Sequence, residues 1–214
     1  MGKLKVALFD FDGVVVDTEP IYDIFWDAAS YRYGLNIENF AQVVKGTTLP
    51  YILETYFSDR TEEYRQMITK ESTDYEKEMD FPPLAGAIDF IHLLKDHGVT
   101  VGLVTSSDDS KLVRAFKELH LDNVFDTIVS ADRITKGKPD PMCYLLAAKD
   151  LGVSPSECVV FEDSFNGIRS AHDAGMRIIG LSTSNSEDSL RDKVFDVIPD
   201  FEHCTFDDYL RWQA

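Results

Sequence analysis

The stretch VALFDFDGV, residues 6–14, joins an apolar run directly to two aspartates. The apolar residues predict a short buried strand, and because strand residues alternate between faces, Asp10 and Asp12 are expected to point to one side. Gly13 supplies a residue that can turn without steric cost. Carboxylates this close either hold a cation between them or leave one protonated, and both arrangements suit catalysis at a phosphate. A strand that ends in a solvated acidic turn is the competing interpretation.

Composition restricts the class of protein. Of the 214 residues, 44% are hydrophobic and 28% charged, which is ordinary globular usage and enough for one core plus a small accessory domain. The net charge of −17 argues against nucleic acid or an anionic membrane as a partner. The apolar run at residues 6–9 is too short for a signal peptide or a membrane span. We therefore expect a folded cytoplasmic protein in which Cys143, Cys158 and Cys204, which lack ligand spacing, are reduced structural thiols.

The spacing of apolar residues divides the chain into two parts. Residues 18–80 have helical spacing, begin at the helix-start signal Thr18-Glu19-Pro20 and end before Pro82-Pro83. After them, strands are predicted at 100–104, 127–129, 158–161 and 177–181, and helices near 110–119, 141–151 and 167–174. This alternation predicts an α/β fold, a Rossmann-like parallel sheet with helices on both faces. We assign residues 1–17 and 81–214 to this core domain and residues 18–80 to an inserted α-helical domain.

Ligands of such sheets bind beyond the carboxyl ends of the strands, so the residues there are the site candidates. Thr105-Ser106-Ser107 follows the strand at 100–104 and offers hydroxyls and turn amides that suit a phosphate, although helix capping explains them equally well. Lys138 precedes a predicted helix and could offset charge on a phosphoryl group, with a solvated loop as the alternative. Glu162 and Asp163 follow the strand at 158–161 and would complete an oxygen-rich Mg²⁺ site, with a helix cap as the competing explanation.

In this order the four groups resemble the motifs of the haloacid dehalogenase-like hydrolase superfamily. The resembled branch has a helical cap inserted after the first strand and includes β-phosphoglucomutase and phosphoglycolate phosphatase. Residues 10–14 (DFDGV) resemble its first motif, Thr105 the Thr/Ser motif, Lys138-Pro139 the lysine motif, and residues 162–168 (EDSFNGI) the acidic motif. The resemblance runs essentially from end to end of the chain. It implies a hydrolase of this superfamily and leaves the substrate open.

The resemblance also implies a role for each residue. Asp10 is the implied nucleophile, which forms an aspartyl-phosphate, and Asp12 is the implied acid and base. Mg²⁺ is implied between the Asp10 carboxylate, the Asp12 backbone carbonyl and the pair Glu162 and Asp163. The remaining phosphoryl oxygens would be held by side chains and amides of the other motifs, namely Lys138, Thr105, Ser106 and Ser107.

Residues 18–80 correspond to the cap of the resembled branch. Such a cap closes over the site about hinges, here expected at residues 17–19 and 81–83, and reads the leaving group of the substrate. Lys45, Gly46 and Thr47 match the position where related caps present a Lys-Gly turn to the active site, so they are predicted to contact substrate. The partner is then a small-molecule phosphate, and by analogy with cap-bearing relatives we expect a monomer.

Two departures from the pattern bear on the activity. The β-phosphoglucomutases carry a hinge histidine and an arginine that secures the second phosphate of the sugar, and here those positions are Tyr22 and Leu49. A second phosphate without such a cation would be poorly held in so acidic a protein. We therefore expect a phosphatase of a sugar or polyol phosphate, with pyrophosphate also open. A β-phosphoglucomutase-type phosphotransferase is the first alternative, and a phosphate-binding signalling module without turnover is a more remote one.

Overall fold

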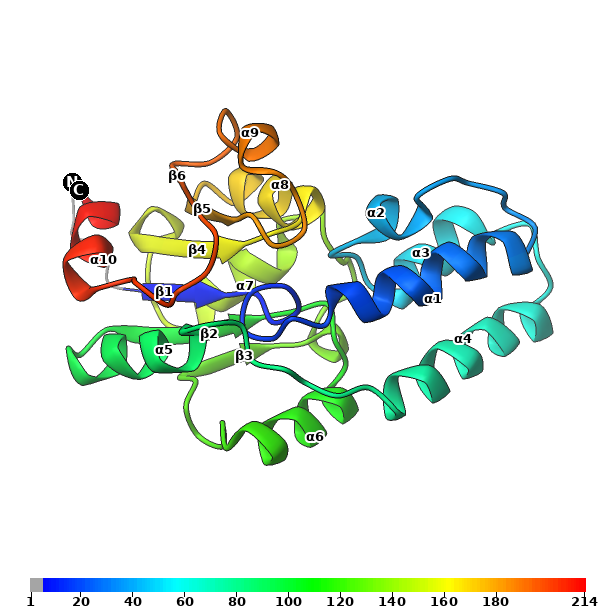
Figure 1. Cartoon of the computed structure of the whole chain (residues 1–214), viewed down its shortest axis with the longest axis horizontal. Coiled ribbons are helices and arrows are strands. Elements are labelled where there is room, and N and C mark those ends of the chain that lie inside the picture. Colours follow the sequence, from blue (N-terminus) through cyan, green and yellow to red (C-terminus); the bar gives the residue numbers. More distant parts are fainter. Residues whose placement is uncertain (1–5) are drawn as a thin grey trace.

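Six strands form one sheet in the computed structural model, which describes residues 6–214 (Figure 1). The strands are β1 (Val6–Phe9), β2 (Thr100–Val104), β3 (Thr127–Val129), β4 (Cys158–Glu162), β5 (Arg177–Leu181) and β6 (Asp196–Ile198). Their order is β3-β2-β1-β4-β5-β6, and every neighbouring pair is parallel. The order reverses between β1 and β4, so the loops after these two strands flank the crevice where such sheets bind ligands. The predicted α/β fold is confirmed.

Helices cover both faces of the sheet because the β1 side chains alternate between two cores. The helices concerned are α5 (Ala87–Asp96), α6 (Asp109–Leu119), α7 (Met142–Asp150), α8 (Phe165–Asp173) and α10 (Phe206–Gln213). Ala7 and Phe9 pack with apolar residues of α5, α6 and α10. Val6 and Leu8 face the other way and pack with α7 and α8. All four β1 side chains are buried, as expected of a central strand in a parallel sheet.

Between β1 and β2 the chain forms a helical block of four helices. They are α1 (Glu19–Arg32), α2 (Phe40–Val44), α3 (Leu49–Tyr56) and α4 (Glu62–Lys77). Figure 1 shows this block on the side to which the strands point. The block has its own apolar cluster, which includes the buried aromatic residues Trp26, Phe40 and Phe57. The predicted helix start is confirmed, because α1 begins at Glu19 with Pro20 in its first turn.

The two connections between the sheet and the helical block run side by side. The Asp17 N–H donates to the Pro82 carbonyl oxygen at 2.8 Å, and Val16 forms an antiparallel bridge with Pro83. A block attached at two adjacent points can rotate as a unit about them, so this geometry suits the hinge expected there.

Three α-helices and one strand of the described residues were not predicted from the sequence pattern. They are α5, α10, the short helix α9 (Glu187–Leu190) and the edge strand β6. The last two have four and three residues, too few to show a period. By contrast, α5 has apolar residues at helical spacing and α10 buries Tyr209 and Trp212, so a wider search for periodicity would have found both.

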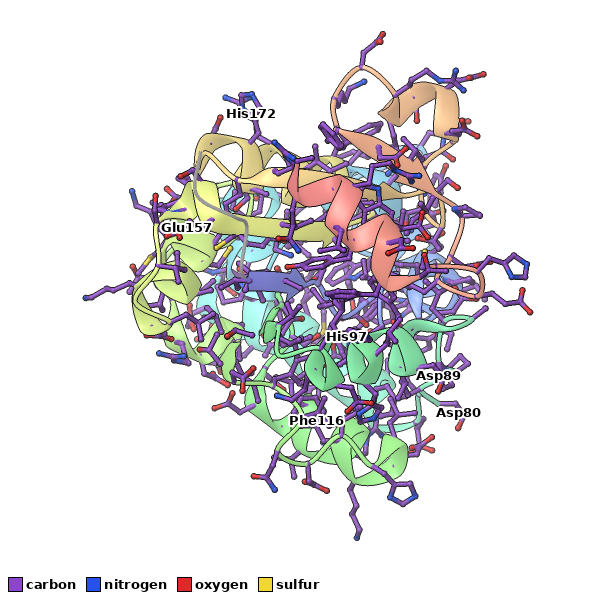
Figure 2. The ribbon with its side chains drawn as sticks, turned by 90° about the vertical axis from the view of Figure 1, so that its left-hand side faces the viewer. Asp80, Asp89, His97, Phe116, Glu157 and His172 are labelled. Carbon is purple, nitrogen blue, oxygen red and sulfur yellow. The ribbon has the colours of Figure 1, made fainter. Side chains whose placement is uncertain are left out.

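Several features lie away from the strand ends. Cys143, Cys158 and Cys204 are free thiols. Within residues 6–214, every helix is too short or too polar to cross a bilayer. Figure 2 views the molecule from the end opposite the helical block, and the exposed residues His97 and His172 are labelled there.

Candidate active site

The loop after β1 brings the first acidic motif against the second. Asp10 directly follows β1, its N–H donates to the carbonyl oxygen of Phe161 in β4 at 3.1 Å, and the residue is buried. Gly13 turns the chain with a φ of +75°, and a Cβ at this position would lie 2.1 Å from Oδ2 of Asp163. Glycine alone combines this backbone conformation with so close an approach. Gly13 of the first motif therefore allows the loop that carries Asp163 to approach closely.

Lys138 is buried between two carboxylates. Its Nζ lies 3.0 Å from Asp10 Oδ1 and 2.6 Å from Glu162 Oε1, and the exposed fraction of Lys138 is 1%. Burial raises the pKa of the Asp10 carboxyl well above its ordinary value; Lys138 opposes this shift, and Glu162 and Asp12 add to it. Burial would lower the pKa of Lys138, but Asp10 and Glu162 outweigh burial and raise it, so the amine stays charged. A fixed cation beside Asp10 can stabilise charge on a transferring group.

Glu162 and Asp163 differ in how their oxygens are used. Oε1 of Glu162 accepts hydrogen bonds from Lys138 and Tyr144, at 2.6 and 3.1 Å. Oε2 accepts from the Asp163 N–H at 3.0 Å and from the N–H and hydroxyl of Ser164, both at 3.1 Å. In Asp163, by contrast, Oδ1 is buried and has no hydrogen-bond partner among residues 6–214. Glu162 is therefore held by the protein, whereas Asp163 offers an unused oxygen.

Asp10, Glu162 and Asp163 together fit a hard divalent cation. One carboxylate oxygen of each lies within 4.8 Å of the others, and all three residues are buried. Burial raises the pKa of the Asp163 carboxyl well above its ordinary value, and the nearby carboxylates, Glu19 foremost, raise it further. Oxygen donors without sulfur or imidazole suit Mg²⁺ or Ca²⁺. A cation here would satisfy the unused oxygen of Asp163 and favour the ionised carboxylates.

Asp12 is surrounded by hydrogen-bond donors. Thr18 Oγ1 donates to Oδ1, and Ser107 Oγ donates to Oδ2 at 2.7 Å. Lys111 Nζ, from the first turn of α6, lies 2.5 Å from Oδ1 and 2.7 Å from Oδ2. Lys111 was not predicted, because a lysine on an amphipathic helix usually reaches solvent. Both oxygens of Asp12 are thus fixed by groups outside the first motif.

The surroundings of the two aspartates shift their pKa values in opposite directions. Burial would raise the pKa of the Asp12 carboxyl, but Lys111 and the hydroxyls of Thr18 and Ser107 outweigh burial and lower it. Asp12 is therefore ionised here, whereas the raised pKa of Asp10 favours its protonated form. The predicted roles need the reverse, an ionised Asp10 and a proton on Asp12. A divalent cation at Asp10 would correct the first of these shifts.

The polar loop after β2 reaches the site as predicted. Thr105 is buried, and its Oγ1 accepts from the Ser107 N–H at 3.0 Å. The Ser106 hydroxyl donates to the Gly46 carbonyl oxygen at 2.7 Å, which joins this loop to the helical block. Both serine hydroxyls already donate to protein groups. A contact of Ser106 or Ser107 with a phosphate would therefore come mainly from the Ser106 N–H, which has no acceptor among residues 6–214.

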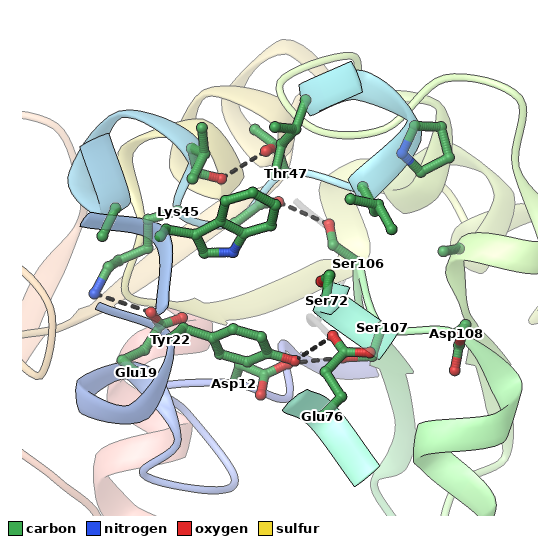
Figure 3. Close-up of a pocket in the computed structure, with 18 of the residues that line it drawn as sticks. Asp12, Glu19, Tyr22, Lys45, Thr47, Ser72, Glu76, Ser106, Ser107 and Asp108 are labelled. Carbon is green, nitrogen blue, oxygen red and sulfur yellow. Dashed lines mark hydrogen bonds and ion pairs between the residues drawn. The ribbon is translucent and has the colours of Figure 1, made fainter. Parts of the chain in front are cut away.

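Lys45 lies on the helical-block side of the site (Figure 3). Its Nζ is 2.9 Å from Glu19 Oε2 and 2.8 Å from Asp23 Oδ1, and Lys45 is buried. Burial raises the pKa of the Glu19 carboxyl to about 7, although Lys45 opposes the shift. Two carboxylates thus compensate the charge of Lys45 before any ligand arrives.

The two residues after Lys45 fix the turn against the core. Gly46 has a φ of +77°, and a Cβ there would lie 2.2 Å from the Ser164 Oγ of the acidic loop. Thr47 Oγ1 donates to the Val44 carbonyl oxygen at 2.5 Å. Asn166, which follows the acidic loop, donates to the Lys45 carbonyl oxygen at 2.9 Å. The structure therefore brings the predicted Lys45–Thr47 turn next to the acidic motif.

A cavity of about 310 Å³ separates the strand ends from the helical block (Figure 3). Asp10 and Asp12 both line it, so the prediction that they share a side holds although β1 ends at Phe9. The carboxylates on the rest of its wall belong to Glu19, Asp23, Glu76, Asp108 and Asp132. Among the described lining residues Lys45 is the sole lysine or arginine. A ligand in this cavity meets carboxylates and hydroxyl groups and very little free positive charge.

A fifth strand end also contributes, and it was missed in the sequence. After β5, the Thr183 hydroxyl donates to the Gly13 carbonyl oxygen at 2.7 Å. Ser184 Oγ donates to the Asp163 carboxylate, and Asn185 Nδ2 donates to the Asp163 carbonyl oxygen at 2.8 Å. These residues hold both acidic loops in place. The polar run directly after the predicted strand at 177–181 was the signal that could have identified them.

Comparison with known proteins places the chain among phosphate-transferring enzymes. A family model described as "Haloacid dehalogenase-like hydrolase" matches residues 7–181, a range that contains Asp10, Lys138 and Asp163 and ends before Thr183. The chain is 31% identical over 187 residues to a phosphorylated carbohydrates phosphatase of Thermotoga maritima, which covers 83% of this chain and 85% of the relative. It is also 31% identical over 185 residues to hexitol phosphatase A of Escherichia coli, which covers 84% of each.

A solved structure agrees with the fold. The crystal structure of a β-phosphoglucomutase from Clostridium difficile matches with a TM-score of 0.82 and covers 98% of this chain and 97% of that one. At 23% identity this likeness supports the architecture, including the helical block after β1, and leaves the activity to other observations.

Proposed function

This chain belongs to the haloacid dehalogenase-like hydrolase family, and on that premise we propose that it is a Mg²⁺-dependent phosphatase of small phosphorylated carbohydrates. Its substrate is a sugar or polyol monophosphate, and the reaction passes through an aspartyl-phosphate on Asp10. The observation that carries the proposal is the buried contact of Asp10, which lines the cavity, with Lys138 beside the acidic pair Glu162 and Asp163.

The two aspartates divide the chemistry between them. One Asp10 carboxylate oxygen bonds to phosphorus as the bond from phosphorus to the leaving oxygen breaks. Asp12, which is ionised in the ligand-free site, must first take up a proton when the anionic substrate binds, and it then passes that proton to the leaving oxygen. In the second step a water oxygen attacks phosphorus, its proton passes to Asp12, and the bond between phosphorus and Asp10 breaks. Inorganic phosphate leaves, and both carboxyl groups return to their starting state.

The acidic cluster would hold the metal ion. Its ligands would be Asp10, Asp163 and the Asp12 backbone carbonyl, and the unused Oδ1 of Asp163 supports this assignment. When bound, Mg²⁺ draws charge off the phosphoryl oxygens. Glu162 was predicted as a further ligand, but its oxygens already accept five hydrogen bonds, which favours a supporting role that orients Lys138 and the Asp163 backbone.

The other strand ends would bind the phosphoryl group. Lys138 is charged and buried against Asp10, so it would neutralise an oxygen close to the point of attack. Thr105 and the Ser106 N–H, at the end of β2, would hold the remaining oxygens.

The helical block would act as the cap that reads the leaving group. It forms the far wall of the cavity with Tyr22 and Lys45 among its lining residues, and it joins the core through the paired connections near Asp17 and Pro82. The carboxylates of this wall repel a second phosphate, and Lys45 is already compensated. This charge pattern favours a monophosphate with a hydroxyl-rich leaving group over the bisphosphate that a β-phosphoglucomutase-type reaction requires.

We further propose that the enzyme works as a monomer in the cytoplasm. The three free thiols suit a reducing compartment. The helical block of the same chain forms the far wall of the cavity, so the site needs no residue of a second copy.

Phosphate release from a panel of compounds tests the proposal. The panel contains sugar and polyol phosphates, pyrophosphate and β-glucose 1-phosphate, each assayed with Mg²⁺ and with a chelator. We expect metal-dependent release, fastest with a sugar or polyol phosphate, and loss of release in Asp10→Asn. Asp122→Asn, which changes an exposed aspartate outside the site, is the matched control and should retain full activity.

Other outcomes would point elsewhere. Conversion of β-glucose 1-phosphate to the 6-phosphate on addition of a bisphosphate, without net phosphate release, would favour the mutase. Consumption of a single equivalent of phosphoryl donor, with no turnover, would favour a binding module.

A further inference from the structure

We propose that Lys111 is a positioning residue that orients Asp12 and couples it to the helical block. The inference rests on the proposed phosphatase function, since Asp12 is the group that would protonate the leaving oxygen. Lys111 belongs to none of the four sequence motifs and is brought to the site by the first turn of α6.

All the hydrogen-bond donors of Lys111 are in use. The residue is 4% exposed, and Nζ lies 2.5 and 2.7 Å from the two oxygens of Asp12. It also lies 2.9 Å from the Tyr22 hydroxyl and 3.0 Å from Ser107 Oγ. An ammonium group has three N–H donors, and these three residues account for them. Lys111 therefore serves protein groups and is not available to bind a second phosphate.

Tyr22 extends the contact into the helical block. Its hydroxyl donates to Glu76 Oε1 at 2.7 Å, and its ring centre lies 4.8 Å from the Lys111 Nζ. Figure 3 shows Tyr22 and Glu76 linked in this way at the cavity wall. Since Tyr22 belongs to α1 and Glu76 to the last turn of α4, a chain of hydrogen bonds runs from Asp12 to two helices of the block.

Arg114, three residues further along α6, fixes the same end of α4. Its guanidinium donates to the backbone carbonyl oxygens of Glu76 and Lys77 and, at 3.2 Å, to that of Met79. The position of Glu76 is therefore set by α6. The network exists only while α1 and α4 lie against α6, so docking of the helical block and orientation of Asp12 depend on each other.

The contact matters because proton transfer demands a well-aimed carboxylate. Thr18 and Ser107 each contact one oxygen of Asp12, whereas Lys111 contacts both and so fixes the plane of the group. Loss of Lys111 would leave Asp12 free to turn away from the leaving oxygen. Attack by Asp10, which is held by Lys138, would be affected far less.

Lys111→Met tests the inference with two leaving groups. An alkyl phosphate, the best sugar or polyol phosphate of the panel, needs a proton on its leaving oxygen, whereas p-nitrophenyl phosphate releases a stable phenolate without one. With the alkyl phosphate we expect kcat to fall roughly 100-fold. In rapid mixing with p-nitrophenyl phosphate, the first equivalent of phenolate should appear within about threefold of the wild-type rate, followed by slow turnover, because the water step still needs Asp12.

The control is Lys117→Met, an exposed lysine on the same helix, which should match the wild type with both substrates. Tyr22→Phe keeps the ring beside Lys111 but removes the link to Glu76. We expect kcat for the alkyl phosphate to fall roughly fivefold, with the rate of the first phenolate equivalent from p-nitrophenyl phosphate unchanged. If Lys111→Met does not fold, Tyr22→Phe and Glu76→Gln carry the same comparison of substrates.

A first equivalent of phenolate that appears as slowly as the alkyl phosphate turns over, or a Lys111→Met enzyme that behaves like Lys117→Met, would refute the positioning role. A wild-type protein that releases phosphate from no compound would instead refute the proposed function. The two failures are therefore distinguishable.

Discussion

The two walls of the cavity are built in different ways. The sheet wall is built from the loops that follow the parallel strands: Asp10 lines the cavity, and Lys138 and Asp163 are buried close to Asp10. The helical wall is built from separate helices and the turns between them: Tyr22 and Glu76 are partly buried, whereas Glu19 and Lys45 form a buried ion pair. Since the sheet wall carries the acidic cluster and Lys138, it suits chemistry shared by many phosphates. On the proposed function, the helical wall would move about its two adjacent connections, and its side chains would select among leaving groups.

Glycines show the same difference between the two walls. Gly13 and Gly46 both have positive φ, and both allow an approach that a Cβ would block. Gly13 brings two carboxylate loops of the sheet wall together, whereas Gly46 brings the helical block against Ser164 of the sheet wall. The first contact builds the acidic cluster, and the second docks the block onto it.

The largest effect is expected when the sheet wall loses its cation. Lys138→Met would leave Asp10 and Glu162 buried without compensation, so we expect kcat to fall roughly 10³-fold and the free energy of unfolding to fall by about 3–5 kcal/mol. Lys136→Met, which changes an exposed lysine of the same loop, is the control and should alter neither. Phosphate release and urea denaturation measure the two quantities. If both lysine variants behaved alike, the sheet wall would not be the source of the chemistry.

In the metal-free protein, buried carboxyl groups of both walls should make the stability depend on pH, and Mg²⁺ should affect only those of the sheet wall. Glu19, at the start of the helical block, has its pKa raised from 4.5 to about 7, and the pKa values of Asp10 and Asp163 in the sheet wall are also raised. The folded state therefore binds more protons than the unfolded state above about pH 4.5, so stability falls as the pH rises toward 7. For Glu19 alone the loss is on the order of 3 kcal/mol. Groups with lowered pKa, such as Asp74, finish titrating below this range and do not offset it.

Melting temperatures between pH 5 and pH 8 measure this dependence. Saturating Mg²⁺ should remove the pH dependence of the melting temperature that is due to Asp10 and Asp163, and it should stabilise the protein most at the alkaline end. Glu19→Gln should remove most of the pH dependence that remains in the presence of Mg²⁺. A melting temperature that rises with pH in the presence of a chelator would contradict the burial of these carboxyl groups.

Gly13→Ala tests whether the two acidic loops must touch. The new Cβ would meet Oδ2 of Asp163, so we expect a loss of activity of roughly 30- to 100-fold and a higher Mg²⁺ requirement, as the acidic cluster is forced apart. Gly98→Ala is a matched control, because Gly98 has a φ of +76° and open space around it. It carries the same backbone strain without the collision. Steady-state kinetics at several Mg²⁺ concentrations compares the two variants, and equal losses would attribute the effect of Gly13 to strain.

The sheet wall was largely predictable from the sequence, for a physical reason. Buried parallel strands are continuous apolar runs, so their ends are visible, and the fold rule that ligands bind there assigns Asp10, Thr105, Lys138 and Glu162 to one place. Ser184 obeys the same rule, although the prediction applied that rule to only four strand ends.

The contacts of the helical wall could not be predicted from the sequence in this way. Helical spacing shows that residues 18–80 form helices, but it does not say how those helices lie on the core. The contacts of Tyr22 with Glu76 and of Lys111 with Asp12 join residues 54 and 99 positions apart, and no local pattern marks them. Lys45 was identified through the family resemblance, whereas its pairing with Glu19 and Asp23 required the structure.

The smallest effect is expected on the helical wall, at Lys45. Because Glu19 and Asp23 already compensate its charge, Lys45→Met should change the binding of a sugar or polyol phosphate without disabling the chemistry. We expect KM for that substrate to rise roughly tenfold with kcat little changed, since a hydrogen bond from Lys45 to the leaving group would stabilise the ground state and the transition state alike. For p-nitrophenyl phosphate, whose leaving group has no hydroxyls to recognise, both constants should stay close to wild type. A fall in kcat for both substrates would place Lys45 with the sheet wall and erase the distinction between the wall that reacts and the wall that selects.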